Sequence, residues 1–135
     1  MSYDELVKGR IYFGGAADTK DAVAKEKIDL VVDVRLNGTV EAANCKTVHA
    51  SIEEQSPAES IKAGVERIAQ SYKAGENIYL HCGSGGGRAG VMATAVLIEL
   101  GLADNLASAE RMVKEARPIV NIRPNMREAL EKLYK

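Results

Sequence analysis

The feature that most limits how this chain can fold is a glycine-rich segment at residues 81–90, which reads HCGSGGGRAG. Four of the five residues from 83 to 87 are glycine, and glycine is costly in backbone entropy unless the chain uses its freedom. Residues 77–81 have the apolar, β-forming character of a buried strand, and residues 89–100 have the apolar pattern of a helix. The segment is therefore predicted to be a turn from a strand into a helix, with backbone N–H groups that a ligand can approach.

The rest of the chain alternates strands and helices early and is helical late. Further strands are predicted over residues 10–13, 28–35 and 47–52, and further helices over 19–27, 57–72, 106–116 and 125–134. This order favours an α/β sandwich whose central, mostly parallel sheet is flanked by helices, with a helical C-terminal half. The length of 135 residues indicates one domain, residues 1–135.

Composition excludes several classes of partner. Charged residues make up 27% of the chain but nearly cancel, to a formal net charge of −1, so no global field attracts nucleic acid or an anionic membrane. The most apolar run, residues 89–102, is shorter than the roughly 20 residues that span a bilayer. We therefore expect a cytoplasmic monomer with reduced cysteines and without nucleic-acid or membrane partners.

The glycine-rich segment has the parts of an anion site. Its amides can form a concave nest, and the helix that follows adds a partial positive charge. Such a setting favours the thiolate of Cys82, and the planar fork of Arg88 can hold two phosphate oxygens. A loop of five residues between Cys82 and Arg88 suits a tetrahedral oxyanion, so the predicted phosphate-binding residues are Gly83, Ser84, Gly85, Gly86, Gly87 and Arg88.

Two alternatives remain open for this segment. A glycine-rich turn that contains a cysteine by accident would look similar. Residues 85–90 also match the dinucleotide fingerprint G-x-G-x-x-G, although no convincing strand–helix–strand unit follows them.

Residues 81–88 resemble the His-Cys-x-x-Gly-x-x-Arg signature of cysteine-based protein tyrosine phosphatases, most closely the small dual-specificity branch. Segments 10–15, 111–118 and 123–125 are similar to other parts of that branch. The resemblance implies a hydrolase that needs neither metal nor cofactor. Cys82 attacks phosphorus to form a phosphocysteine, and water then hydrolyses it. The substrates implied are phosphotyrosine, phosphoserine or phosphothreonine in proteins, or small phosphoesters.

The resemblance also implies a carboxylic acid that protonates the leaving oxygen. The family uses an aspartate, and aligning the preceding strand and Pro57 puts Glu54 at that position. Glu53 and Asp33 are the alternatives. Glu53 and Glu54 can also be solvated charges at the start of a helix, where carboxylates are favoured in any case.

Two further positions bear on catalysis. Ala89 stands where the family has a serine or threonine whose hydroxyl stabilises the departing cysteine sulfur, so hydrolysis of phosphocysteine is expected to be slow unless Ser84 or a water substitutes. His81 matches a histidine that orders the cysteine loop, although it can equally be a satisfied core residue. Cys45 is expected to be a small buried hydrophobe rather than a disulfide partner of Cys82.

Two rival functions follow from the same residues. Ala89 and the missing aspartate are compatible with a catalytically silent module that binds phosphoproteins. A rhodanese-type sulfurtransferase also places a loop cysteine after a strand, but its loop is usually shorter. A zinc set of Cys45, His49, His81 and Cys82 is disfavoured, because adjacent residues of a strand point to opposite faces.

Overall fold

A five-stranded sheet forms the centre of the computed structural model, which describes residues 3–36, 45–83 and 86–134. In space the strands follow the order β1-β2-β5-β3-β4. β2, β5, β3 and β4 run parallel to one another, and β1 is antiparallel to β2 at the edge. The bounds are Asp4–Val7 for β1, Ile11–Gly15 for β2, Leu30–Asp33 for β3, Lys46–His49 for β4 and Ile78–Cys82 for β5.

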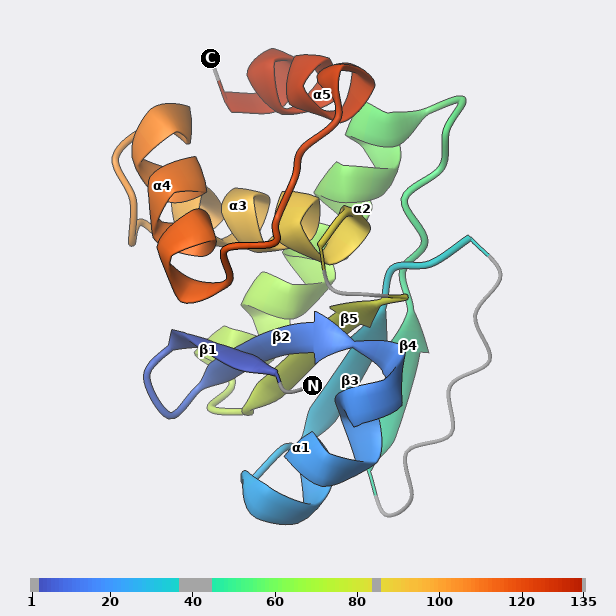
Figure 1. Cartoon of the computed structure of the whole chain (residues 1–135), viewed down its shortest axis with the longest axis vertical. Helices are drawn as coiled ribbons and strands as arrows, with labels where there is room; N and C mark the ends of the chain where they lie inside the picture. Colours follow the sequence, from blue (N-terminus) through green and yellow to red (C-terminus); the bar gives the residue numbers. More distant parts are fainter. Residues whose placement is uncertain (1–2, 37–44, 84–85, 135) are drawn as a thin grey trace.

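The helices lie on both faces of this sheet (Figure 1). The short 3-10 helix η1 (Ala16–Asp18) leads into α1 (Thr19–Lys25) on one face. The other face is covered by a layer made of α2 (Pro57–Lys73), α3 (Arg88–Glu99), α4 (Leu106–Ala116) and α5 (Pro124–Tyr134). The expected α/β sandwich with a mostly parallel sheet and a helical C-terminal half is therefore confirmed.

Side chains alternate across the sheet as the two-residue period of a strand requires. Ile78 and Leu80 of β5 pack into the large core under the helical layer, whereas Tyr79 between them packs into a smaller cluster under α1. All nine residues from Ala89 to Leu97 of α3 are buried, so this helix lies at the centre of the helical layer. α3, with 12 residues, is too short to span a bilayer, and no other helix in the described ranges is both long and apolar enough to do so.

Several element boundaries differ from the sequence-based prediction. β3 covers Leu30–Asp33 rather than residues 28–35, and β2 extends to Gly15 rather than ending at residue 13. β1 was not predicted, because its four residues are mixed in polarity and only partly buried. β4 was expected over residues 47–52 but ends at His49, and Ala50 and Ile52 continue only by single hydrogen bonds to Asp33 O (2.8 Å) and Val34 O (3.2 Å). α1 ends at Lys25, where the next residue is already extended.

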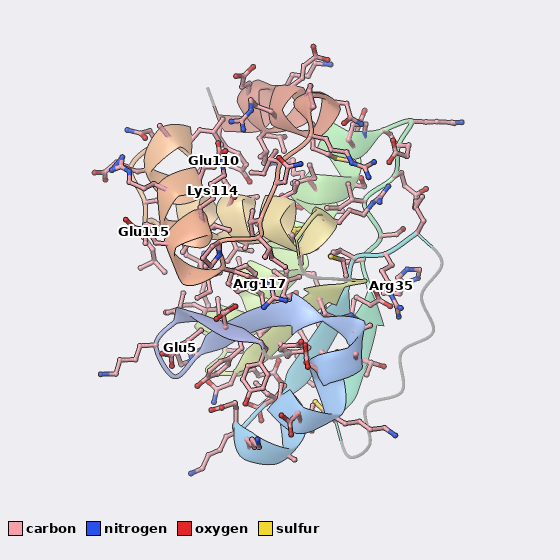
Figure 2. All side chains as sticks on the ribbon, viewed as in Figure 1. Glu5, Arg35, Glu110, Lys114, Glu115 and Arg117 are labelled. Atoms are coloured by element: carbon pink, nitrogen blue, oxygen red, sulfur yellow. The ribbon has the colours of Figure 1, made fainter. Side chains whose placement is uncertain are left out.

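An ion pair joins the edge of the sheet to the helical layer. Arg117, directly after α4, lies between the helical layer and the sheet (Figure 2). It is buried and donates to Asp4 Oδ2 of β1 at 2.8 Å. A different edge of the sheet is formed by the carboxyl ends of the parallel strands β2, β5, β3 and β4, which end level with one another. Because carboxyl ends of parallel strands share one edge, this edge is where ligands usually bind in open α/β sheets.

Candidate active site

The glycine-rich segment connects the last residue of β5, Cys82, to the first residue of α3, Arg88. The backbone of the loop is held on both sides. Gly83 O accepts from Ala16 N at 3.1 Å, and Gly86 O accepts from Asn121 N at 2.7 Å. Gly83 is therefore anchored to the start of η1, and Gly86 to the connection from α4 to α5.

The predicted phosphate-binding residues are only partly described. Ser84 and Gly85 lie outside the described residues. Gly83 and Gly87 do not have left-handed φ, so these two positions do not use the positive φ that glycine allows. A Cβ added at either would meet no atom within 4 Å, so the space beside both backbones is open.

Cys82 and His81 end the buried strand β5. Cys82 is 5% exposed. The ring of His81 is buried, stacks on Tyr79 at 5.8 Å between centroids, and places Nδ1 3.2 Å from Cys82 O. Burial lowers the pKa of His81, so the ring is neutral and donates Nδ1–H to this carbonyl. The contact is compatible with the predicted ordering role, which stays a prediction.

Arg88 is directed at the segment that carries the predicted acid. Its Nε donates to Ile52 O at 3.0 Å, and its Nη2 donates to Glu54 Oε2 at 2.5 Å. The second oxygen of Glu54 lies 3.5 Å from Asn125 Nδ2. The fold thus brings together the arginine predicted to bind phosphate and the predicted acid, which are 34 residues apart in the chain.

The two alternative carboxylates have other partners. Glu53 accepts from the Ser51 hydroxyl, and its backbone N–H is bound by Ser60 Oγ at 2.9 Å. Asp33 is completely buried and paired with Arg35. Burial alone would raise the pKa of Asp33, but hydrogen bonds from the Arg35 side chain and backbone lower it, which disfavours Asp33 as a proton donor.

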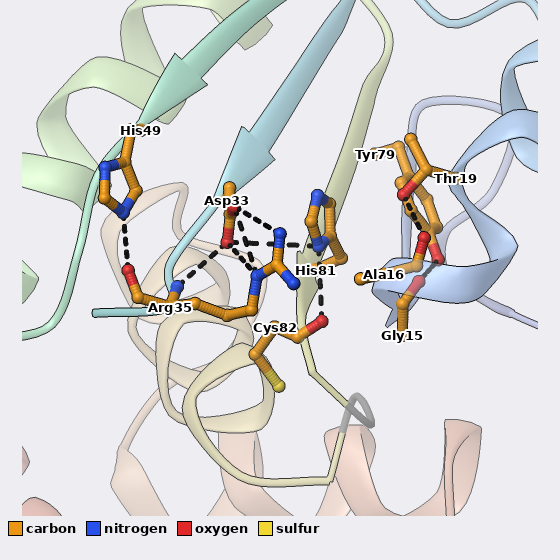
Figure 3. Close-up of polar contacts among 9 residues, drawn as sticks. All are labelled: Gly15, Ala16, Thr19, Asp33, Arg35, His49, Tyr79, His81 and Cys82. Atoms are coloured by element: carbon orange, nitrogen blue, oxygen red, sulfur yellow. Dashed lines mark hydrogen bonds and ion pairs between the residues drawn. The ribbon is translucent and has the colours of Figure 1, made fainter. Parts of the chain in front are cut away.

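Arg35 is a residue of this site that the sequence interpretation missed. Figure 3 shows its guanidinium between Asp33 and the strand that ends at Cys82. The available signal was its position two residues after Asp33, at the end of a strand that runs parallel to β5. The sequence interpretation also missed a small pocket beside Arg88, whose polar lining includes Glu54, Asn121 and Arg123.

The remaining predicted positions lie as follows. Ala89 is completely buried in the first turn of α3, with its methyl group in the core. Cys45 is half-buried directly before β4, at the opposite end of the sheet from Cys82, so the two cysteines are not placed to form a disulfide. Within the described ranges, no group of three or more His, Cys, Asp or Glu side chains is close enough to hold a metal ion.

The arrangement is suited to transfer of an oxyanion group to a thiolate. The predicted nucleophile, Cys82, ends a buried strand, a helix N-terminus follows the loop, and an arginine and a carboxylate lie at the exit of the loop. Groups of this kind stabilise the charge that develops when a phosphoryl group moves.

Comparisons with known proteins agree with this geometry. Residues 16–131 match the family described as "Swiss Army Knife protein, DSP-PTPase phosphatase domain". No curated protein matches the sequence. The fold resembles that of a mouse putative dual specificity phosphatase solved with zinc tungstate, with a TM-score of 0.85 and 18% identity over 96% of this chain and 84% of that one.

Two other solved structures are similar. Human DUSP28 has a TM-score of 0.84 and 20% identity over 96% of this chain and 90% of that one. PTPMT1 in complex with PI(5)P has a TM-score of 0.78 and 19% identity over 96% of this chain and 92% of that one. At these identities the likeness carries the fold.

Proposed function

Because the chain belongs to the DSP-PTPase phosphatase domain family, we propose that it hydrolyses phosphomonoesters through a phosphocysteine on Cys82. The family match confirms the resemblance indicated by residues 81–88. It also leaves a sulfurtransferase without any observation in its favour.

One observation carries the proposal. Cys82 and Arg88 stand at the two ends of a loop whose amides can bind phosphate, and the Glu54 carboxylate contacts Arg88. A nucleophile, a phosphate ligand and an acid in one place are what phosphoryl transfer to a thiolate needs.

In the first step the Cys82 thiolate attacks phosphorus and the bond from phosphorus to the ester oxygen breaks. The loop amides and Arg88 bind the non-bridging oxygens. Phosphate competes with Glu54 for the guanidinium, so substrate binding frees the Glu54 carboxylate. The freed carboxylate takes up a proton from solvent and then gives it to the leaving oxygen. General acid catalysis of this kind contributes about 10²- to 10⁴-fold.

In the second step water attacks the phosphocysteine. The Glu54 carboxylate takes a proton from the water, the sulfur–phosphorus bond breaks, and inorganic phosphate leaves with the thiolate regenerated. Ala89 offers no hydroxyl to the departing sulfur, so this step limits turnover. Ser84 is the side chain in the loop that can replace it.

The proposed substrates are proteins phosphorylated on tyrosine, serine or threonine, or small phosphoesters. We propose that the protein acts on them as a monomer in the cytoplasm. One protein of similar fold, PTPMT1, was solved in complex with the phosphoinositide PI(5)P. In this chain the loop has no lysine between Cys82 and Arg88, which favours substrates of lower charge.

The test is a rapid-mixing assay with para-nitrophenyl phosphate in the absence of metal. Cys82→Ser should abolish turnover. Glu54→Gln should slow the step that releases nitrophenolate by about 10²-fold or more, and should slow phenyl phosphate hydrolysis further, because phenolate is a poorer leaving group. Glu53→Gln is the matched control, with its carboxylate bound to Ser51, and should keep the wild-type rate.

A stoichiometric burst followed by near silence would mean that phosphocysteine forms but does not hydrolyse. If the protein shows no burst and no turnover, the proposed enzyme activity is refuted. That outcome would favour the alternative, a phosphoprotein-binding module. That alternative is favoured by Ala89 and by an Arg88 that is already paired with a carboxylate. Such a module binds phosphopeptide without releasing phosphate, and Arg88→Ala abolishes the binding.

A further inference from the structure

A buried carboxylate holds a second arginine beside the catalytic loop. Asp33 Oδ1 accepts from the Arg35 backbone N–H at 2.9 Å and from Arg35 Nε at 3.0 Å, and Oδ2 accepts from Nη2 at 2.9 Å. The Asp33 side chain is 0% exposed, whereas that of Arg35 is 29% exposed. The pair therefore has a buried negative end and a positive end that reaches toward the surface.

Arg35 supplies the hydrogen bonds and the ion pair that hold the Asp33 carboxylate. His81 Nδ1 lies 4.0 Å from Asp33 Oδ1, but burial keeps the ring neutral. Taking a carboxylate out of water costs several kcal/mol unless it is paired with good geometry. The bidentate contact satisfies this requirement and fixes the direction of the guanidinium.

The strand register places this arginine beside the end of β5, where Cys82 lies. Asp33 is opposite His81 in the parallel pair of β3 and β5, and the ladder continues as Val34 N donates to His81 O at 3.0 Å. Arg35 therefore lies level with the residue that follows Cys82. Its guanidinium is close enough to Cys82 to interact with it electrostatically, in agreement with Figure 3.

A second strand holds the backbone at this point. His49, the last residue of β4, places Nε2 2.5 Å from Arg35 O. The guanidinium has five N–H donors in a planar fork, so it can bind a carboxylate along one edge and a second oxyanion along another. Arg88, in contrast, has its Nε and Nη2 directed at Ile52 O and Glu54.

We propose that Arg35 is a second arginine that binds the substrate phosphate over Cys82, and that Asp33 is the residue that positions it. This inference rests on the proposed phosphatase function, since it needs a phosphate bound at the loop. It adds a substrate-binding residue from the end of β3, outside the signature segment.

The experiment is calorimetric titration of the full chain with inorganic phosphate, together with steady-state hydrolysis of para-nitrophenyl phosphate. Arg35→Gln should weaken phosphate binding by roughly 10- to 100-fold, as expected for loss of hydrogen bonds to a charged group. KM should rise by a similar factor, with a smaller change in kcat. Arg35→Lys retains the positive charge but not the planar guanidinium. Its phosphate affinity should lie between that of the wild type and that of Arg35→Gln.

Asp33 is tested by its coupling to Arg35. Asp33→Asn should weaken phosphate binding, and the double variant Asp33→Asn/Arg35→Gln should be no weaker than Arg35→Gln alone. Because Arg35→Gln leaves a buried carboxylate without this partner, it can fail to fold. The double variant has no buried charge at this point and then takes its place in the titration.

Lys62→Gln on α2 is the matched control, since it removes the same charge from an exposed side chain and should leave phosphate binding unchanged. Equal phosphate affinity of wild type and Arg35→Gln would overturn the inference while leaving the phosphatase proposal intact. An equal loss in Lys62→Gln would also overturn it. Absence of phosphate binding by the wild-type chain would overturn both.

Discussion

Replacing Gly90 by alanine should displace the glycine-rich loop by overpacking the residues that support it. Gly90 lies in the buried first turns of α3, and a Cβ built there would be 2.6 Å from Val120 Cγ1 and 3.2 Å from Val120 Cγ2. Val120 is 4% exposed and β-branched, so it has little freedom to turn away. The next residue, Asn121, is the one that holds Gly86 O of the loop.

The magnitude follows from two opposing effects. Alanine in a helix interior is favoured over glycine by about 1 kcal/mol, whereas overpacking a core costs about 1–3 kcal/mol. The expected net loss is about 1 kcal/mol, which for a chain of this size lowers Tm by roughly 4 °C. A shift of Asn121 that misplaces the loop by about 1 Å can reduce kcat/KM by up to about 100-fold.

Gly64→Ala provides the matched control for thermal melting and para-nitrophenyl phosphate hydrolysis. Its Cβ would meet Met92 Cε at 2.5 Å, but this atom is the end of a flexible side chain that can move. Gly64→Ala should therefore keep or raise Tm and retain activity. If Gly90→Ala melts at or above the wild-type temperature with full kcat/KM, the coupling between Val120 and the loop is refuted.

Two other substitutions test separate parts of the structure. Ala89→Ser should return a hydroxyl to the position next to Arg88 and raise steady turnover about 10-fold without changing the initial burst of nitrophenolate; an unchanged steady rate would exclude Ala89 as the cause of slow hydrolysis. Hydrogen bonding to Arg127 lowers the pKa of Glu110 from 4.5 to about 2, so the charged form stabilises the fold fully above about pH 4.5 and loses this effect as pH falls toward 2. Glu110→Gln should thus unfold more readily than wild type at pH 7 in circular dichroism, with a difference that shrinks below pH 4.5; a pH-independent difference would contradict this linkage.

The sequence was informative where the pattern is local. Residues 106–116 match α4 at both ends, because Asn105 caps the helix by accepting from Ser108 N at 2.8 Å. The strand, turn and helix around Cys82 were likewise predictable, since apolar periodicity and clustered glycines need no knowledge of distant residues.

Features that depend on pairing across the fold were not predictable. β1 is a short edge strand that exists because it pairs with β2 and its Asp4 binds Arg117. The bidentate contact of Arg35 with Asp33 is local in sequence, but its relation to Cys82 depends on which strand lies next to β5. The order of strands in the sheet is a property of the topology, and the apolar periodicity of the sequence does not predict it.

The hydrogen bonds of Gly83 and Gly86 connect the glycine-rich loop to parts of the chain that are synthesised at different times. Gly83 is bound by the N-terminal Ala16, and Gly86 by Asn121, near the C-terminal end. A growing chain that has just completed α3 therefore contains every residue of the signature but still lacks the contact with Asn121. The contact of Gly86 with Asn121 can form only when the connection to α5 has been made, so the proposed active site is completed late in synthesis of the chain.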